Sequence, residues 1–101
     1  MLKIDPTAYE IMHENGTKSP FDTTCIYCTV HDAFVQDEGH DAIQSDRVEA
    51  ICDNLVRDVS LAVTRGRESG TIHIDHINDI IELELRRREH DRVARNFRRM
   101  L

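Results

Sequence analysis

The chain has 101 residues, of which 40% are hydrophobic and 32% charged, and its formal net charge at pH 7 is −6. This length supports one domain and excludes a second core of useful size. No stretch of about 18 apolar residues is present to cross a membrane, and residues 1–6 lack the apolar core of a signal peptide. The odd number of cysteines is typical of free thiols in a reducing compartment, so we expect a cytoplasmic protein.

The first structured elements are predicted to form a β-hairpin. Residues 1–8 are expected to be a flexible lead. Strand candidates over residues 9–14 and 18–20 flank Asn15 and Gly16. Both turn residues tolerate the positive φ that a primed turn requires, so we expect a primed turn at this position.

Apolar residues then recur at helical spacing in two segments. The first predicts a helix over about residues 23–36, capped by Asp22 and followed by a polar loop at 37–41. The second predicts a longer helix from Ser45, a good N-cap, to the polar segment 65–70. The two apolar stripes are Ile26, Val30, Ala33 and Phe34, and then Val48, Ile51, Cys52, Leu55, Val59 and Ala62.

The rest of the chain predicts one strand and two helices. Residues 71–74 alternate and are rich in β-branched side chains, Asp75 is expected to cap a third helix, and residues 88–91 separate it from a fourth. The apolar faces are Ile77, Ile80, Ile81 and Glu84 or Leu85, and then Val93, Ala94, Phe97 and Met100. Because short one-sided helices must share a core, we predict an α+β fold over residues 9–101: a four-helix bundle capped by a small three-stranded sheet.

Charge is distributed unevenly along the chain. Residues 86–99 carry seven Arg against Glu89 and Asp91, a local balance of +5, which leaves −11 on the remainder. Arg side chains near a helix C-terminus favour the helix dipole, and a basic segment of this kind can also attract phosphate or acidic partners. The few aromatic residues and the acidic overall balance argue against a nucleic-acid partner.

The cysteines suggest a zinc site as an alternative. Cys25, Cys28 and His31 lie close together in the sequence, and Cys52 could be a fourth ligand. Structural zinc pairs of this spacing usually lie on knuckle turns, whereas this segment is predicted to be helical. We therefore favour thiols that behave as small apolar side chains, and we expect neither a metal site nor catalytic residues.

The opening of the chain resembles the ATP-cone domain. That family begins with an aliphatic residue, a basic pair, Asp or Asn, Gly and, after four variable residues, Phe-Asp, with Lys-Ile following two residues later. The residues that match this frame are Ile11, Asn15, Gly16, Phe21, Asp22 and Ile26. His13 and Glu14 replace the basic pair, and Cys25 replaces the Lys.

Two later segments extend the resemblance to almost the whole chain. Residues 69–82 are similar to the strand and third helix of the family. Residues 93–97 are similar to its Val-Ala-x-x-Tyr run, with Phe97 in the place of Tyr. We expect either an excised domain or a free-standing cone.

The resemblance implies a regulatory domain of ribonucleotide reductase rather than an enzyme. Such a domain senses ATP and dATP, bound with Mg²⁺, and controls oligomeric state and activity. The implied partners are the catalytic domain of the large subunit, the small subunit, and further copies of the same chain. The candidate nucleotide-binding residues are His13, Glu14, Asn15, Gly16, Lys18, Phe21, Asp22, Cys25, Ile26 and Asn78.

The replaced cations leave other interpretations open. A triphosphate brings about three to four negative charges, which cationic side chains, backbone donors or a metal must balance. Lys18, or an Arg of the fourth helix, could replace part of the lost charge. A degenerate cone could instead serve protein–protein interaction or oligomerisation, and a helical adaptor could bind an acidic partner through its Arg-rich end.

Overall fold

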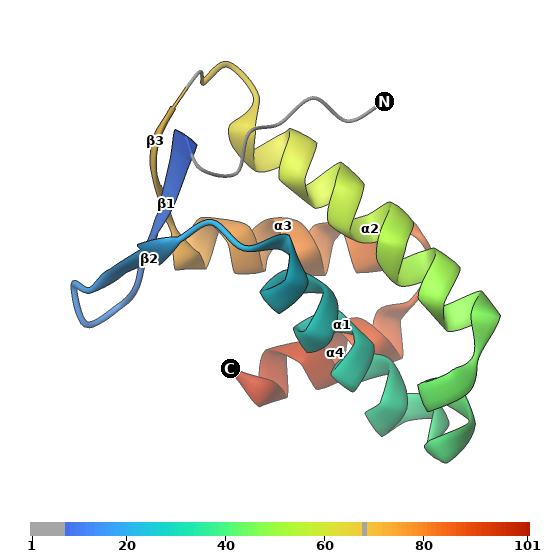
Figure 1. Ribbon diagram of the computed structural model, residues 1–101. Helices are drawn as coiled ribbons and strands as arrows, with labels where there is room; N and C mark the ends of the chain where they lie inside the picture. The colour runs from blue at the N-terminus through green and yellow to red at the C-terminus, as the bar shows by residue number, and fades with distance from the viewer. Residues whose placement is uncertain (1–7, 68) are drawn as a thin grey trace.

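The computed structural model describes residues 8–67 and 69–101 and has the predicted α+β architecture (Figure 1). The elements are β1 (Tyr9–Met12), β2 (Lys18–Pro20), α1 (Thr23–Glu38), a 3₁₀ helix (His40–Gln44), α2 (Asp46–Thr64), β3 (Gly70–His73), α3 (Ile74–Arg87) and α4 (Asp91–Met100). Apart from Ala8, the predicted flexible lead lies outside the described residues. No described helix has the length and apolar character needed to span a membrane.

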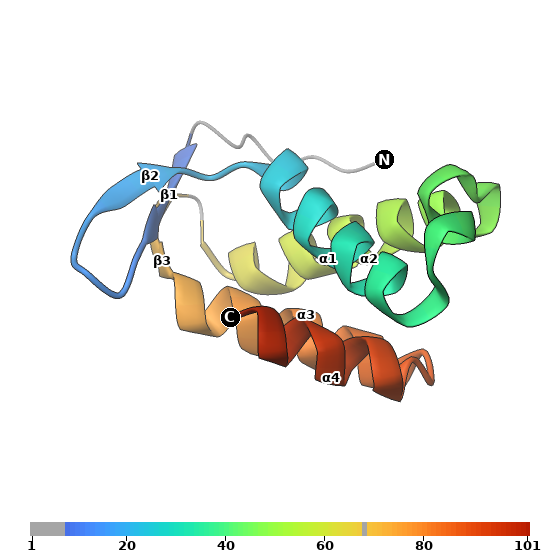
Figure 2. The ribbon, with the colours of Figure 1, turned by 90° about the horizontal axis from the view of Figure 1, so that it is seen from below.

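The three strands form one mixed sheet in the order β2-β1-β3. β1 pairs antiparallel with β2, where Ile11 lies opposite Ser19, and parallel with β3, where Ile11 lies opposite Ile72. Ile11 and Ile72 are buried and attach the sheet to the helical core. The sheet lies at one end of the bundle, and β3 continues directly into α3 (Figures 1 and 2). The prediction that the third strand joins the hairpin is therefore confirmed.

The hairpin turn differs from the predicted primed turn. The backbone N–H of Gly16 donates to the carbonyl of His13 over 3.0 Å, and the N–H of His13 donates to the carbonyl of Thr17 over 2.8 Å. Gly16 has φ of +86°, whereas Asn15 does not adopt a positive φ. The prediction was wrong because the loop is one residue longer, with a tight turn that closes on a left-handed glycine. The Asn15 side chain instead accepts a hydrogen bond from the N–H of Thr17 at 3.1 Å.

The four helices enclose one apolar core, as predicted. α1 packs against α2 and α4, and α3 packs against α2 and α4. In Figure 2, α3 and α4 lie side by side and run in opposite directions. The predicted stripe residues that are buried are Ile26, Val30, Ala33, Phe34, Val48, Cys52, Leu55, Val59, Ile77, Ile81, Glu84, Leu85, Val93, Ala94 and Phe97.

The helix starts follow the predicted caps with one exception. Asp22 and Ser45 each accept a hydrogen bond from a backbone N–H in the first turn of α1 and α2, at 2.8 and 3.2 Å. α3 begins at Ile74, and its N-cap is His73, whose Nδ1 accepts from the N–H of Asp75 at 3.1 Å. The prediction that Asp75 caps this helix was wrong, because the His73 ring provides the acceptor two residues earlier. Asp75 lies in the first turn, where its charge favours the helix dipole.

Candidate functional site

A narrow cleft of about 120 Å³ lies between the hairpin, the start of α1 and the start of α3. Ile26, Ile77 and Ile81 line it and are 5%, 1% and 2% exposed, so its inner wall is apolar. Its polar lining residues are His13, Ser19, Asp22, Cys25, Thr29 and Asn78. An apolar wall with a few polar groups is typical of pockets that hold a ring system and fix its orientation.

A wider, open cleft of about 610 Å³ adjoins the narrow one. Its lining residues are His13, Glu14, Asn15, Thr17, Ile74, Asn78 and Leu101. His13, Ile74 and Asn78 line both clefts, so the two spaces share a wall. A molecule with an apolar ring in the narrow cleft can therefore extend a polar chain into the open one.

Hydrogen bonds hold the polar side chains around the narrow cleft. The Nε2 atom of His13 lies 2.7 Å from the Oγ of Ser19 across the hairpin. The carboxylate of Asp22 accepts from the N–H of Thr24 at 2.8 Å and from the thiol of Cys25 at 3.5 Å. The pKa of Asp22 is lowered, mainly by the hydrogen bond from the backbone N–H of Thr24. The pKa of Cys25 is raised, mainly by the hydrogen bond that its thiol donates to Asp22. At neutral pH this wall therefore carries a carboxylate and an uncharged thiol.

Most of the predicted site residues line one or both clefts. Those that do so are His13, Glu14, Asn15, Asp22, Cys25, Ile26 and Asn78. Phe21 lies in the core instead, 3% exposed, with its ring centroid 6.2 Å from that of Tyr9. Gly16 shapes the turn, and Lys18 is exposed on β2. Neither of these two residues, nor Phe21, lines either cleft.

Several lining residues were not among the predicted site residues. These are Thr17, Ser19, Pro20, Thr29, Ile11, Ile74, Ile77, Ile81 and Leu101. Helical spacing offered a signal for two of them, because Thr29 lies one turn after the predicted residue Cys25 and Ile81 one turn after the predicted residue Asn78. The others required the tertiary structure, since they reach the clefts from separate elements.

The cleft lining is poor in positive charge. Among the described residues that line the two clefts there is neither Lys nor Arg, whereas Glu14 and Asp22 supply carboxylates. His13 is the basic side chain of this lining. A phosphate group in the open cleft would therefore need a cation from beyond the lining, or a metal ion.

The arginines of residues 86–99, here called the Arg-rich segment, mostly form ion pairs within the molecule. The pairs are Arg86 with Glu82 at 3.1 Å, Arg87 with Glu84 at 3.0 Å, Arg88 with Glu84 at 2.6 Å and also with Asp58, Arg92 with Asp37 at 2.9 Å, and Arg98 with Asp79 at 2.5 Å and Glu82 at 2.6 Å. In the described part of the chain, Arg95 and Arg99 have no such pair. Arg88, Arg92 and Arg98 therefore join one helix to another, whereas Arg86 and Arg87 pair within α3.

The cysteines considered as zinc ligands do not converge. Cys52 is fully buried, and burial is the main cause that raises the pKa of its thiol to about 12. Cys25 and Cys28 are exposed, and the ring of His31 stacks on Tyr27 with centroids 5.8 Å apart. Within residues 8–67 and 69–101, no group of three or more His, Cys, Asp or Glu side chains is arranged to hold a metal ion.

Comparison with protein families identifies the domain. The family model of the ATP cone domain matches residues 9–100. The chain belongs to the ATP-cone domain family. The match includes the hairpin, all four helices and nearly all of the cleft lining. ATP-cones are nucleotide-binding regulatory domains and are not catalytic. A search of curated proteins returned no match.

Proposed function

We propose that this ATP-cone binds ATP or dATP across the two clefts and regulates a ribonucleotide reductase. The observation that carries the proposal is the apolar cleft and its open neighbour, which meet where the hairpin, α1 and α3 come together. The base and ribose would lie against Ile26 and Ile77. Asn78, which lines both clefts, offers an amide donor and acceptor to the base edge or the ribose hydroxyls.

The triphosphate would lie in the open cleft, beside the hairpin loop. Glu14 is exposed in this lining and would repel a bare phosphate. Mg²⁺ is usually held by one or two carboxylates together with substrate phosphates, and the hard oxygen atoms of Glu14 fit this ion. Glu14 would then hold the ion between itself and the phosphates, where the ion neutralises charge.

Regulation would follow from the position of the site. The residues that line the clefts come from the hairpin, α1 and α3, so a nucleotide bound there would hold these elements together. A change in their relative position can alter the outer surface of the domain, because packed elements shift as units. The proposed recipients of that change are the catalytic domain of the large subunit, the small subunit, or a second copy of the chain.

Calorimetric titration tests the proposal. The pure chain would be titrated with ATP and with dATP, each with Mg²⁺, and each mixture would then be sized by light scattering. We expect binding of both nucleotides at micromolar concentration and a change of size that depends on dATP. GTP and CTP serve as controls for the base. Binding of all four nucleotides with equal affinity would contradict an adenine-specific site.

A second function is favoured by the lack of Lys and Arg in the described cleft lining. In this alternative the cone has lost its ligand and acts as an interaction or oligomerisation module. It predicts no binding of ATP or dATP up to millimolar concentration, from a chain that remains fully folded. Its interaction with an acidic partner would weaken as salt is raised, because exposed charges are screened.

A further inference from the structure

Arg98 lies near the open cleft although it does not line it. α4 runs back along α3, so that its last turn lies beside the first turns of α3 (Figure 2). Arg98 pairs with Asp79, which directly follows the cleft residue Asn78. Leu101, one helical turn after Arg98, lines the open cleft itself. The Arg98 guanidinium is therefore bound to a residue that directly follows the cleft lining.

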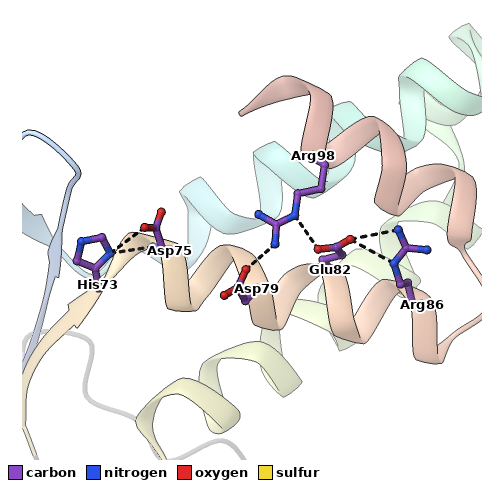
Figure 3. Close-up of polar contacts among 6 residues, drawn as sticks. All are labelled: His73, Asp75, Asp79, Glu82, Arg86 and Arg98. Carbon is purple, nitrogen blue, oxygen red and sulfur yellow. Dashed lines mark hydrogen bonds and ion pairs between the residues drawn. The ribbon is translucent and has the colours of Figure 1, made fainter.

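The two contacts of Arg98 differ in their exposure to solvent. Its Nε donates to Glu82 at 2.6 Å and its Nη2 to Asp79 at 2.5 Å, as Figure 3 shows. The Glu82 side chain is 22% exposed and is also bound by Arg86, whereas the Asp79 side chain is 63% exposed. An exposed ion pair is weak because water and salt screen it. The contact with Asp79 is thus the more exposed of the two, and the one that a ligand from solution can reach.

We propose that Arg98 binds the phosphates of the nucleotide and that Asp79 competes with them for its guanidinium. This inference rests on the proposed function. Release of Asp79, with Glu82 still bound, would leave an outer nitrogen of Arg98 free beside the cleft residue Asn78, where it could donate to a phosphate oxygen. Phosphate accepts two parallel hydrogen bonds from a guanidinium and carries more charge than one carboxylate.

The exchange would connect the site to α4. Arg98 joins the last turn of α4 to α3 through Asp79 and Glu82. A ligand with phosphates would replace the contact with Asp79, whereas a ligand without phosphates would leave it intact. The presence of phosphates on the ligand would therefore be detected at the end of α4.

Nuclear magnetic resonance titration of the ¹⁵N-labelled chain tests the inference. Adenosine, AMP and ATP, each with Mg²⁺, would be added to the parent chain and to Arg98→Gln, Asp79→Asn and Arg95→Gln. We expect Arg98→Gln to weaken ATP binding about tenfold and Asp79→Asn to tighten it about threefold. Neither variant should change the affinity for adenosine. The matched control Arg95→Gln, which removes an exposed charge from the same helix, should change neither affinity.

Each other outcome overturns the inference. Equal weakening of ATP binding by Arg98→Gln and Arg95→Gln would indicate a general charge effect. If Asp79→Asn leaves ATP affinity unchanged, Asp79 does not compete. If adenosine binds the parent and ATP affinity is insensitive to Arg98→Gln, the inference fails while the proposed function survives. If neither adenosine nor ATP binds the parent, the inference and the proposed function both fail. Arg98→Lys keeps the positive charge but loses the two parallel hydrogen-bond donors of the guanidinium, so it should lose only part of the ATP affinity. This conservative variant also controls for misfolding.

Discussion

In the Arg-rich segment, most arginines pair with carboxylates of α1, α2 or α3, whereas the charged or basic side chains that line the two clefts are Glu14, Asp22 and His13. Both regions are rich in charge, but only the first is balanced internally. The comparison teaches that a basic segment of sequence need not be a ligand site. Here most of the arginines pair with carboxylates within the molecule, and the clefts depend on positive charge brought to them.

The largest effect is expected from moving cations into the cleft. The triple variant His13→Lys, Glu14→Arg and Cys25→Lys should raise ATP affinity by at least about a thousandfold, because each charge-assisted contact contributes about 1.5–3 kcal/mol. The Arg at position 14 would take over the charge balance that the ion held by Glu14 supplies in the parent, so the gain should not depend on Mg²⁺. Calorimetric titration measures the change. The control Glu49→Arg with Asp53→Lys alters the net charge by the same amount on exposed positions of α2. If the control tightens binding as much, or if the triple variant binds no better than the parent, the cleft is not the phosphate site.

The ion pairs of the Arg-rich segment are tested by Arg88→Met. Arg88 is 25% exposed and pairs with Glu84 and Asp58, and Glu84 is itself 9% exposed at its side chain. Removing it leaves a largely buried carboxylate with one partner fewer, so the free energy of unfolding should fall by about 2–3 kcal/mol. Urea denaturation measures the loss. Arg87→Met, at a side chain 68% exposed, should cost less than about 1 kcal/mol. Equal losses would show that burial does not decide the effect.

A smaller, pH-dependent effect is expected at Glu82. Hydrogen bonds from Arg98, and then from Arg86, lower the pKa of this carboxyl below its usual 4.5. The charged form is therefore favoured in the folded state, and its contribution is present above about pH 4.5 and lost as pH falls through the folded pKa. The difference in unfolding free energy between the parent and Glu82→Gln should be about 1 kcal/mol at pH 7 and shrink in acid. A difference independent of pH would contradict this origin.

The smallest effect is expected at the corner between α3 and α4. Glu89 has φ of +64°, which is strained for a residue with a Cβ. Glu89→Gly should raise the free energy of unfolding by about 0.5–1 kcal/mol, because glycine accepts this conformation without strain. Thermal unfolding followed by circular dichroism measures the gain. Glu89→Ala keeps the Cβ and should give no stabilisation, so an equal gain from both variants would assign the effect to the lost charge.

The sequence by itself determined the features that depend on neighbours in the chain. Helical spacing was sufficient to identify the four apolar faces, and the caps Asp22 and Ser45 were recognisable because a cap bonds within its own first turn. The narrow-cleft residues Cys25 and Ile26 followed from the family frame. The turn at Asn15 and the cap at His73 were mispredicted. In each case two local arrangements were available, a shorter or a longer loop and an Asp or a His cap, and the sequence does not show which one is more stable.

Only the tertiary structure decided which distant residues meet. The parallel pairing of β1 with β3, the burial of Phe21 and the contribution of Ile74 to both clefts depend on how the sheet lies against the bundle. Likewise, Arg98 reaches Asp79 because α4 packs antiparallel to α3, and no local pattern encodes that contact. Spacing and capping act over a few residues, whereas charge pairing and cleft shape are set by packing between elements far apart in the chain.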